Sequence, residues 1–390
     1  MVDKFEKKDC NGCAVCGAVC KMGAIHFQSD ELTGFRYPVV EKEKCVTCGL
    51  CIEECPQNNP LRRKILPEAK VYAAWSKNDE IRLMCTSGGL FYEIASFVIG
   101  QKGAVAACSY TEDFRGAYHR VAVNQEELIP LCGSKHVQSD TIGIYEKTKK
   151  LLEEYPLVLF VGTPCQTAAL YRFLGKEPER LLTVDFICNS INSPKAQAKY
   201  IDYLEELYGS KLVSARSKDK RNGWTSFGSS ARFANGEEYY AGRKHDARVV
   251  GYHQGHLFIR ESCLNCQYKS LPRNADLTLG DFWGIEKDRR NPKLELGTSV
   301  VMANSEKGLA FVERLKSEIG YYEKNLADVI KGNPALIQCV TANGNGPRAF
   351  QALETMRFDY VVDRYRSREG VKQRICRYGR KIVKAVLRRG

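Results

Sequence analysis

Seventeen cysteines are distributed along this chain of 390 residues, and eight of them fall into two short runs of the same form. The first run consists of Cys10, Cys13, Cys16 and Cys20, and the second of Cys45, Cys48, Cys51 and Cys55. An odd number of cysteines at such short spacings favours metal ligation in a reducing compartment over disulfide formation. Because thiolates are soft ligands, the metals that they select are zinc and the iron of iron–sulfur clusters.

Each run reads C-x-x-C-x-x-C-x-x-x-C, which is the spacing of bacterial two-cluster ferredoxins. In that arrangement three thiolates of a run surround one cluster, and the fourth points away to ligate the other cluster. We therefore predict one 4Fe-4S cluster held by Cys10, Cys13, Cys16 and Cys55, and a second held by Cys45, Cys48, Cys51 and Cys20. Structural zinc is the alternative, although zinc knuckles usually use two C-x-x-C pairs with a longer loop between them. The expected dicluster domain spans residues 1–66 and ends in a linker rich in Pro, Asn and Arg.

Beyond residue 70, apolar strands alternate with helical segments of ordinary length. The expected strands include 71–75, 103–110, 117–123, 157–161 and 181–187, and the expected helices are 89–100, 142–155, 166–174 and 193–208. This alternation predicts an α/β or α+β domain with a mixed sheet, which we place at residues 67–345. After residue 211, shorter polar segments predict β-hairpins around Asn235-Gly236. The G-x-G-x-x-G fingerprint of a Rossmann dinucleotide site is absent from the sequence.

Three loops have the composition of ligand-binding segments. Residues 85–90, Cys-Thr-Ser-Gly-Gly-Leu, precede an apolar helix, where backbone N–H groups favour an anion such as a pyrophosphate; an ordinary Ser N-cap is the alternative. Residues 133–140, Gly-Ser-Lys-His-Val-Gln-Ser-Asp, are dense in donors, and a solvated loop is the alternative. Residues 162–166, Gly-Thr-Pro-Cys-Gln, follow a buried strand and open a helix, the place where ligands bind in α/β sheets.

Nine cysteines lie outside the two runs. Cys263 and Cys266 form a C-x-x-C in a polar loop, while Cys165 and Cys188 each follow a predicted buried strand. Because the carboxyl ends of parallel strands meet at one edge of a sheet, we expect these four to converge on a further metal site. That site is a third 4Fe-4S cluster or a zinc ion. We interpret the others as structural thiols, since a buried cysteine commonly behaves as a small hydrophobe: Cys85, Cys108, Cys132, Cys339 and Cys376.

Several of these segments resemble the beta subunits of coenzyme F420-reducing hydrogenases and F420-dependent dehydrogenases, with a ferredoxin domain fused at the N-terminus. The resembling segments are residues 86–89, 133–139, 160–166, 185–188, 262–266 and 275–284, which together cover roughly residues 70–300. Hydroxymethyl-chlorophyll reductases are similar as well, so the resemblance describes the cofactors better than the substrate. It implies a small ferredoxin-like domain followed by a mixed-sheet, flavin-binding α/β domain.

The resemblance also implies bound FAD and a third 4Fe-4S cluster ligated by Cys165, Cys188, Cys263 and Cys266. It turns the three loops into FAD contacts, and the residues concerned are Ser87, Gly88, Gly89, Ser134, Lys135, Gln138, Ser139, Gly162, Thr163, Pro164 and Gln166. To Lys135 we assign the catalytic role of a positive charge beside the flavin N1/O2 edge. Ferredoxin-fused bacterial chains of this form resemble those encoded among polysaccharide-assembly proteins. The hydride donor or acceptor is therefore either a deazaflavin of the F420 type or an unidentified substrate of polysaccharide assembly, and the resemblance does not decide between them.

We predict from these residues an iron–sulfur, flavin-dependent oxidoreductase that passes electrons between 4Fe-4S clusters, FAD and a hydride donor or acceptor. Its expected redox partner is a ferredoxin, a deazaflavin or another oxidoreductase subunit. A non-catalytic subunit that relays electrons to a partner enzyme is the second hypothesis, and a zinc-stabilised scaffold is the third.

The positive charge of the chain is concentrated at its C-terminus. Residues 364–390 contain 11 Lys and Arg and one acidic residue, and so carry ten of the 13 net positive charges. The rest of the chain lacks the basic excess of a nucleic-acid-binding protein. We predict a C-terminal region of residues 346–390 with an amphipathic helix from Val371, which packs on the body or binds an anionic membrane surface. No apolar run is long enough to span a bilayer and residues 1–10 have no signal-peptide pattern, so we expect a cytoplasmic protein, peripheral at the inner face of the membrane if the tail binds lipid.

Overall fold

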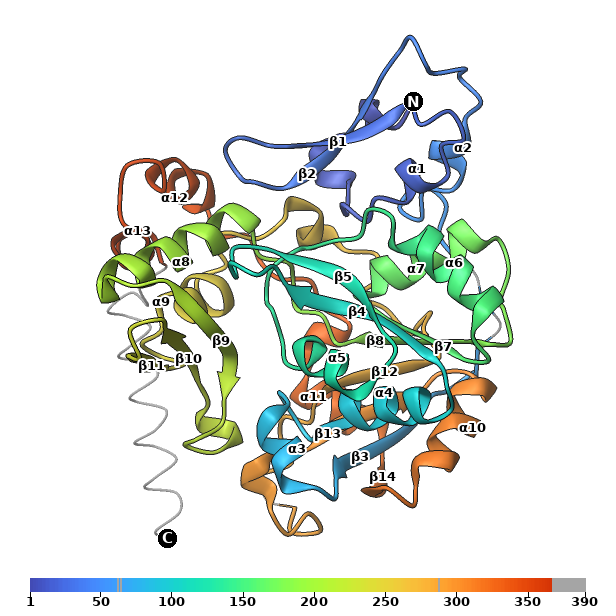
Figure 1. Cartoon of the computed structure of the whole chain (residues 1–390), viewed down its shortest axis with the longest axis vertical. Helices are drawn as coiled ribbons and strands as arrows, with labels where there is room; N and C mark the ends of the chain where they lie inside the picture. The colour runs from blue at the N-terminus through green and yellow to red at the C-terminus, as the bar shows by residue number, and fades with distance from the viewer. Residues whose placement is uncertain (62, 64, 287, 367–390) are drawn as a thin grey trace, which may run out of the picture.

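The computed structural model describes residues 1–61, 63, 65–286 and 288–366. In these residues nine strands form one mixed sheet with the order β14-β3-β13-β12-β8-β7-β4-β5-β6 (Figure 1). The strands β4, β7, β8 and β12 are parallel neighbours, as are β5 and β6, and the other pairs are antiparallel. The mixed sheet expected from the sequence is therefore confirmed. The strands are β3 (Lys70–Ser76), β4 (Ala104–Tyr110), β5 (Ala117–Ala122), β6 (Ser139–Asp140), β7 (Val158–Val161), β8 (Leu181–Phe186), β12 (Leu277–Asp281), β13 (Ser299–Ala303) and β14 (Ile319–Lys324).

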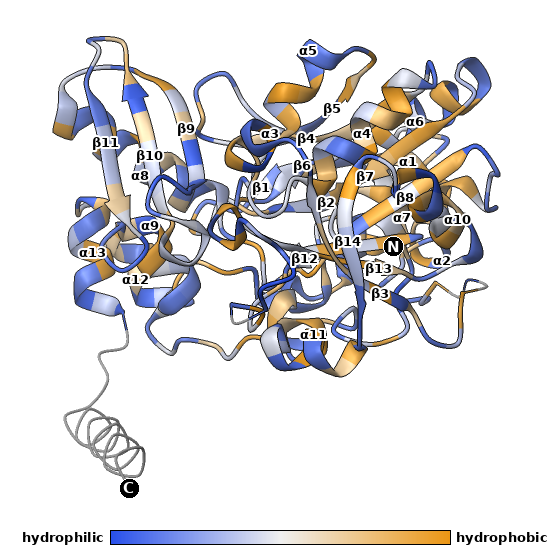
Figure 2. Ribbon diagram, turned by 90° about the horizontal axis from the view of Figure 1, so that it is seen from below, coloured by the Kyte–Doolittle hydropathy of each residue, from blue (hydrophilic) through white to orange (hydrophobic). Residues whose placement is uncertain are grey.

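Helices cover both faces of this sheet because successive side chains of a strand point to opposite sides. Val105 and Ala107 of β4 pack in one core with α4 (Leu90–Gly100) and α10 (Glu306–Leu315). Ala104 and Ala106 pack in another core with α6 (Ile144–Glu154) and α7 (Pro164–Leu174). Strands buried on both faces have continuous apolar sequences, and Figure 2 shows β7 and β8 in hydrophobic colours.

A second lobe lies beside the main sheet (Figure 1). Its antiparallel sheet contains β9 (Leu212–Asp219), β10 (Gly228–Phe233) and β11 (Glu238–Gly242), and Gly236 has φ +89° in the hairpin predicted at Asn235-Gly236. The lobe shares one core with α8 (Pro194–Tyr208), α12 (Gly346–Ala352) and α13 (Phe358–Tyr365). Residues 346–366 therefore pack on this lobe. The amphipathic helix expected from Val371 lies outside the described residues and stays a prediction.

The N-terminal part is a small unit at one end of the molecule (Figure 1). It contains the antiparallel pair β1 (Ile25–Ser29) and β2 (Arg36–Val40), with the short helices α1 (Val15–Ala18) and α2 (Leu50–Glu53). The remaining α-helices of the described chain are α3 (Asp79–Met84), α5 (Gln125–Leu128), α9 (Ala247–Val249) and α11 (Leu326–Gly332). None of the helices described has both the length and the apolar character needed to cross a bilayer.

Candidate functional site

The two cysteine runs share one backbone conformation around their second cysteine. In the first run Gly12 and Ala14 have φ +66° and +62°, and in the second run Thr47 and Gly49, at the equivalent positions, have φ +53° and +83°. Alternating left- and right-handed residues turn successive backbone N–H groups to one side and form a concave anion site, as at many iron–sulfur centres. Residues other than glycine rarely adopt such angles. The repetition in both runs therefore indicates two cluster loops of equivalent structure.

Four thiols from the two runs share one site in the N-terminal unit. Burial raises the pKa of the Cys16 thiol, and the neighbouring Cys10 and Cys55 raise it further. Burial also raises the pKa of Cys13; a backbone hydrogen bond from Val15 opposes this, and Cys55 adds to it. Cys55 of the second run thus lies beside the first three cysteines of the first run, the arrangement that an exchange of the fourth cysteines requires.

The other four cysteines of the runs differ in exposure, and only Cys48 among them is exposed. Cys45 and Cys51 pack in a small core with Val40. The backbone N–H of Ala24 lies 3.3 Å from the sulfur of Cys20 and donates a hydrogen bond to it. Such N–H···S bonds tune a cluster once the thiolate is ligated.

The structure brings together Cys165, Cys188, Cys263 and Cys266. Burial raises the pKa of Cys165 to about 12, and the charges of Cys266 and Cys188 add to the shift. Burial also raises the pKa of Cys263, to which Cys188 and Cys165 contribute. In the described part of the chain, no three His, Cys, Asp or Glu side chains are gathered as for a single metal ion. The four thiols are thus electrostatic neighbours at a looser spacing. Cys339, which the sequence analysis interpreted as a structural thiol, lies beside this set: its sulfur accepts a hydrogen bond from the backbone N–H of Cys266 at 3.2 Å.

This third set of thiols lies next to the first cluster site. Cys165 contributes to the raised pKa of Cys13, although burial is the main cause. The buried Tyr268 responds to both, since burial raises its pKa most and Cys165 and Cys13 follow. Cys188, on the other side of the set, lines the large cavity described below.

Polar contacts fix the first cluster loop on the sheet domain. The guanidinium Nε of Arg260 donates to the carbonyl of Cys10 at 2.7 Å, and its Nη1 donates to Gln138 Oε1 at 2.8 Å. The Gln138 amide in turn donates to the carbonyls of Asn11 and Gly12, each at 3.2 Å. Gln138, which we expected at FAD, is therefore used to hold the dicluster unit.

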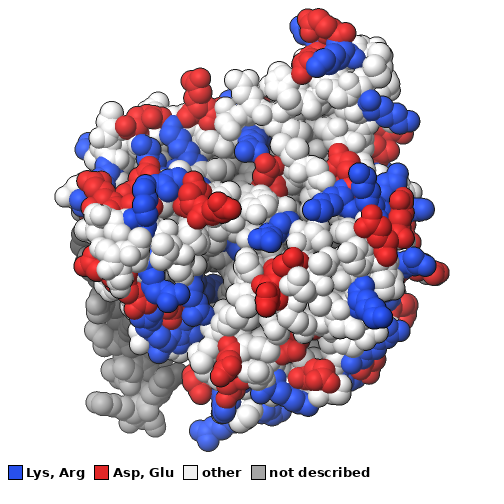
Figure 3. All heavy atoms as spheres, viewed as in Figure 1, with Lys and Arg blue, Asp and Glu red and all other residues white. Residues whose placement is uncertain are grey.

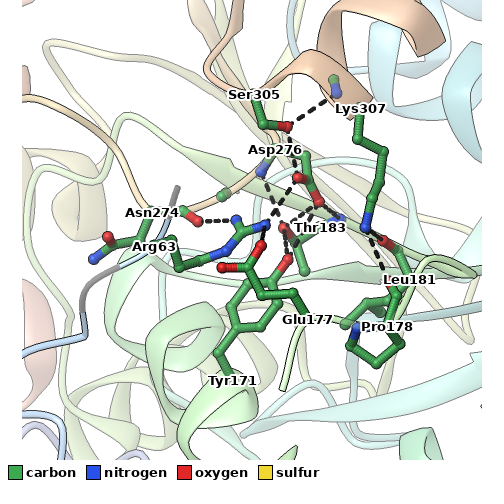
Figure 4. A network of polar contacts seen from close by, with 12 residues as sticks. Arg63, Tyr171, Glu177, Pro178, Leu181, Thr183, Asn274, Asp276, Ser305 and Lys307 are labelled. Carbon is green, nitrogen blue, oxygen red and sulfur yellow. Dashed lines mark hydrogen bonds and ion pairs between the residues drawn. The ribbon is translucent and has the colours of Figure 1, made fainter. Parts of the chain in front are cut away.

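A buried ion pair anchors the linker between the two parts (Figure 4). Arg63 Nη2 lies 3.1 Å from Asp276 Oδ1, with 2% and 0% of the two side chains exposed, and the guanidinium lies 3.9 Å from the centre of the Tyr171 ring. Asp276 also accepts from the backbone N–H of Thr183 at 2.9 Å and from the hydroxyl of Ser305 at 2.7 Å. Burial on its own raises the pKa of Asp276, but Arg63 and these hydrogen bonds outweigh it and lower that pKa. The ionised carboxylate thus ties the linker to the sheet.

A cavity of about 1090 Å³ opens at the carboxyl ends of β7, β8 and β12, where α/β folds bind ligands. Its size is at the upper end of small-molecule sites. Gly88, Gln138 and Pro164 do not line it; the backbone N–H of Gly88 is bonded to Ser299 Oγ at 2.9 Å. Of the flavin contacts expected from the sequence, eight do line it: Ser87, Gly89, Ser134, Lys135, Ser139, Gly162, Thr163 and Gln166.

The two helices that begin at the cavity differ in how their N-termini are satisfied. At α7, Thr163 and Gln166 form a capping box, and the backbone N–H of Thr163 donates to Gln166 Oε1 at 2.9 Å. At α4, the N-cap Gly89 has φ +90°, and no side chain of the described structure caps it. A Cβ at Gly89 would lie 3.1 Å from Ser76 Cβ, so the backbone here has no room for a side chain. These features fit a pyrophosphate at the N-terminus of α4.

Lys135 lies in the cavity lining with its ammonium turned onto its own loop. The ammonium donates to the carbonyls of Leu131, Cys132 and Gly133 at 2.8, 2.9 and 3.1 Å, which uses all three of its donors. Burial lowers the pKa of Lys135. The positive charge that we predicted beside the flavin N1/O2 edge would then act without a direct hydrogen bond from the ammonium, because its three donors are used by backbone carbonyls.

The cavity lining also contains basic and aromatic residues that the sequence analysis missed. Lys218 lies 5.4 Å from the ring centre of Trp283, and Arg243 and Lys244 line the same cavity. The face seen in Figure 3 is hollowed beside the lobe that carries β9, and Lys and Arg side chains gather near the hollow. Lys218, Arg243 and Lys244 belong to no recognisable sequence motif. They line the cavity because the lobe that contains β9 packs beside the sheet domain.

Two histidines also line the cavity. The ring centres of His136 and His253 are 4.5 Å apart, in an edge-to-face arrangement. Burial lowers the pKa of both, that of His253 to about 3, so both rings are neutral at pH 7. Their spacing in the sequence, without a metal-type pattern, gave no signal of this pairing.

Comparison with known proteins defines the class. Residues 9–59 match the family model of the 4Fe-4S dicluster domain, and residues 155–328 match that of the C terminus of the coenzyme F420 hydrogenase/dehydrogenase beta subunit. This chain thus combines an N-terminal 4Fe-4S dicluster domain with a domain that belongs to the F420 hydrogenase/dehydrogenase beta-subunit family. The resemblance seen in the sequence is confirmed, as is the prediction of iron–sulfur clusters in the N-terminal domain. The protein is of the iron–sulfur oxidoreductase type.

Three similar proteins illustrate the relationship. The chain is 22% identical over 350 residues to the uncharacterized protein MJ1349 of Methanocaldococcus jannaschii, which covers 80% of this chain and 87% of that protein. It is 35% identical over 82 residues to one subunit of the Na(+)-translocating ferredoxin:NAD(+) oxidoreductase complex of Acetobacterium woodii, covering 20% of this chain and 22% of that subunit. A chain of the F420-reducing [NiFe] hydrogenase complex from Methanosarcina barkeri superposes with a TM-score of 0.47 and 17% identity, over 69% of this chain and 89% of that chain.

Proposed function

We propose that this protein is an iron–sulfur flavoprotein oxidoreductase with three 4Fe-4S clusters and one FAD. When bound, FAD supplies the exchange between two-electron hydride chemistry and one-electron steps. The observation that carries this proposal is the spatial order of the thiols. Cys51 contributes to the raised pKa of Cys55 of the first site, Cys165 of the third set contributes to that of Cys13 of the first site, and Cys188 of the third set lines the cavity. This order provides a continuous path for single electrons from the dicluster domain to the cavity.

The cavity lining offers groups for both a cofactor and a substrate. The uncapped N-terminus of α4, with Ser87 and Ser134 in the same lining, supports FAD binding. Lys218, Lys244 and Trp283, which also line the cavity, suit an anionic, planar hydride partner, such as a deazaflavin of the F420 type. This second group of residues favours an enzyme over a subunit that only relays electrons. A substrate from polysaccharide assembly stays a prediction from resemblance.

The external redox partner is expected to approach the second cluster site. Cys48 is exposed there, and exposure shortens the distance between a cluster and a partner's redox centre. A ferredoxin or another oxidoreductase subunit fits this role. Peripheral membrane binding through the tail also stays a proposal, since residues 367–390 are outside the described structure.

Anaerobic purification followed by iron, sulfide and flavin analysis tests the proposal. We expect about 12 iron atoms, from three 4Fe-4S clusters, and one FAD per chain. The isolated protein is then supplied with reduced deazaflavin, NAD(P)H or reduced ferredoxin, and bleaching of the flavin and cluster absorbance is followed. Turnover of a small hydride acceptor by the isolated chain supports the enzyme. Flavin-free protein, or flavin that no donor reduces, contradicts the proposal.

A further inference from the structure

Two buried cations lie behind the loop of residues 85–90. Arg82 belongs to α3 and is 2% exposed, and Lys220 follows β9 and is 3% exposed. The Lys220 ammonium donates a hydrogen bond to the backbone carbonyl of Arg82, so the two residues are in contact. Neither side chain lines the cavity, and the sequence carried no signal for either of them. The fold thus places two positive charges close together in the interior.

Backbone carbonyls surround both cations. The Lys220 ammonium also donates to the carbonyls of Ser87 and Leu296 at 2.7 and 2.6 Å. Arg82 Nη2 donates to the carbonyl of Gly297 at 2.8 Å, while its Nε is buried without an acceptor among the described residues. These hydrogen bonds satisfy donors, but they do not neutralise the two charges.

The acidic groups near the two cations are exposed or paired with other residues. Asp79 and Glu295 act on Arg82, and Asp281 acts on Lys220. Asp79 and Asp281 form ion pairs with other lysines, and Glu295 is exposed. Burial lowers the pKa of Lys220 to about 7, and the neighbouring charge of Arg82 adds to the lowering. Because buried charges are normally paired, these two cations of the described chain indicate a negative charge supplied from outside it.

Both cations are linked to Ser87, which lines the cavity. Lys220 holds its carbonyl directly. Arg82 holds the carbonyl of Gly297, which has φ +101°, and a Cβ at Gly297 would lie 2.8 Å from the same Ser87 carbonyl oxygen. The two charges therefore lie immediately behind one peptide of the cavity lining.

The loop keeps its carbonyl oxygens away from a bound anion. The carbonyl of Ser87 is bonded to Lys220, and that of Gly88 accepts from the backbone N–H of Ser76 at 2.7 Å. Since the C=O and N–H of a trans peptide point in opposite directions, the N–H of Gly89 lies on the other side of the second peptide. Glu93, in the first turn of α4, accepts from Ser76 Oγ and does not line the cavity.

We propose that Arg82 and Lys220 supply the counter-charge for the diphosphate of FAD at residues 87–89. This inference rests on the proposed function and adds to it the residues that neutralise the cofactor. Each phosphate of the diphosphate carries a negative charge, so its binding offsets the cost of burying the two cations. Neither cation touches the ligand, and Lys220 is a positioning residue that acts through its charge and through the Ser87 peptide. Riboflavin has the same ring system without phosphate and gains nothing from either cation.

Flavin titrations of the full-length protein test this proposal. Flavin is removed anaerobically, and FAD or riboflavin is titrated back while the quenching of flavin fluorescence is followed. In Lys220→Gln we expect the affinity for FAD to fall about tenfold or more and that for riboflavin to change less than about twofold, because only FAD carries charge at this site. A purely structural role of Lys220 would weaken both flavins equally. Unchanged FAD affinity, or an equal loss for the two flavins, would overturn the proposal.

Lys307→Gln is the matched control. The Lys307 ammonium also donates to two backbone carbonyls, those of Pro178 and Leu181 at 2.9 Å each, and Lys307 does not line the cavity. Loss of this ammonium should leave both flavin affinities unchanged. A loss of FAD affinity in Lys307→Gln equal to that in Lys220→Gln would show that the effect is not specific to the cavity loop, and would overturn the proposal.

Inorganic pyrophosphate separates this proposal from the proposed function. We expect it to raise the thermal unfolding midpoint of the flavin-free wild type and to compete with FAD, and to do neither in Lys220→Gln. A wild type that responds in this way but takes up no flavin would support the anion site and contradict the flavoprotein. A wild type that binds FAD but does not respond to pyrophosphate would overturn the counter-charge alone, and this measurement does not depend on the folding of any variant.

Discussion

The hydroxyl of Tyr145 lies 2.7 Å from the backbone carbonyl oxygen of Cys13 and donates a hydrogen bond to it. Thr141 Oγ1 donates to the same carbonyl at 2.8 Å. Tyr145 belongs to α6 of the sheet domain and is completely buried, so two hydroxyl groups of that domain hold the loop of the first cluster site. We expect the distance from this site to Cys165, and with it the rate of the proposed electron transfer, to depend on these contacts.

Removal of both hydroxyls tests this dependence. Tyr145→Phe and Thr141→Val should each destabilise the protein by about 1 kcal/mol, and the double variant by about 2–3 kcal/mol, because it leaves a buried carbonyl without these donors. Thermal unfolding measures the loss. Stopped-flow reduction through the dicluster domain should also be slower in the double variant, at unchanged iron content. Tyr118→Phe, at a partly exposed tyrosine, is the control; a double variant as stable and as fast as the wild type would contradict the role of the two hydroxyls.

The Arg63–Asp276 pair should be important for stability because both partners are buried. Arg63→Met leaves a buried carboxylate without its cation, and breaking such a pair typically costs about 3–5 kcal/mol. Lys293→Met at the exposed pair with Asp79 is the matched control and should cost less than about 1 kcal/mol. Thermal unfolding at pH 7 compares the two. Equal losses in the two variants would show that burial gives the Arg63 pair no special weight.

The Arg63–Asp276 pair also predicts how the stability of the folded protein decreases at acid pH. Because the pKa of Asp276 is lowered in the folded state, its contribution is present above the unfolded pKa of about 3.9 and is lost as the pH falls through the folded pKa. Without the lowering charge of Arg63, the pKa of Asp276 in the folded state is higher than in the wild type, so Arg63→Met should begin to lose stability at a higher pH. Unfolding midpoints measured between pH 7 and pH 3 check this. Parallel profiles of the two proteins would contradict it.

Local patterns in the sequence predicted local geometry well. The cysteine spacing identified both cluster loops, since ligand spacing within one loop is a matter of chain geometry, and the strand ends indicated that Cys165 and Cys188 would converge. The loop of residues 133–140 shows where such reasoning stops. Its Ser134 and Ser139 face the cavity, whereas Gln138 faces the dicluster domain, and no periodicity in an irregular loop separates its two sides.

Contacts between distant segments were the part that the sequence did not reveal. The return of residues 346–366 to the lobe of α8 and the contact of Gln138 with the first cluster loop both depend on tertiary packing. The mixed sheet itself was predictable because each buried strand and helix has its own pattern. Which loops then lie side by side at the sheet edge depends on the strand order, with β3 and β13 inserted between β14 and β12.

Flavin binding at the N-terminus of α4 is best tested at Ser87. Its hydroxyl donates to the carbonyl of Thr298 at 2.9 Å, and the residue lines the cavity. Ser87→Asp places a negative charge beside the site proposed for the pyrophosphate and should weaken FAD binding about tenfold, or about 1.4 kcal/mol. Ser87→Ala is the control, because it removes the hydrogen bond without adding charge. Gly89 is unsuitable, since any side chain at its φ of +90° strains the backbone. Equal flavin content in the two variants would argue against this site.

The third cluster assignment can be tested with three cysteines that lie together. The Cys263→Ser/Cys266→Ser variant should lose about four of about 12 iron atoms, because it removes two of four thiolates while the dicluster domain keeps all of its ligands. Cys339→Ser is the matched control: Cys339 bonds to the backbone of Cys266 but is outside the proposed ligand set, so iron content should stay unchanged. Iron and sulfide analysis with EPR of the reduced proteins measures both.

Unchanged iron in the double variant excludes a cluster at these thiols, and loss of iron in Cys339→Ser would place Cys339 among the ligands. Zinc in place of the lost iron would favour the zinc alternative, whose tetrahedral geometry requires the thiolates to lie closer together than a cubane does.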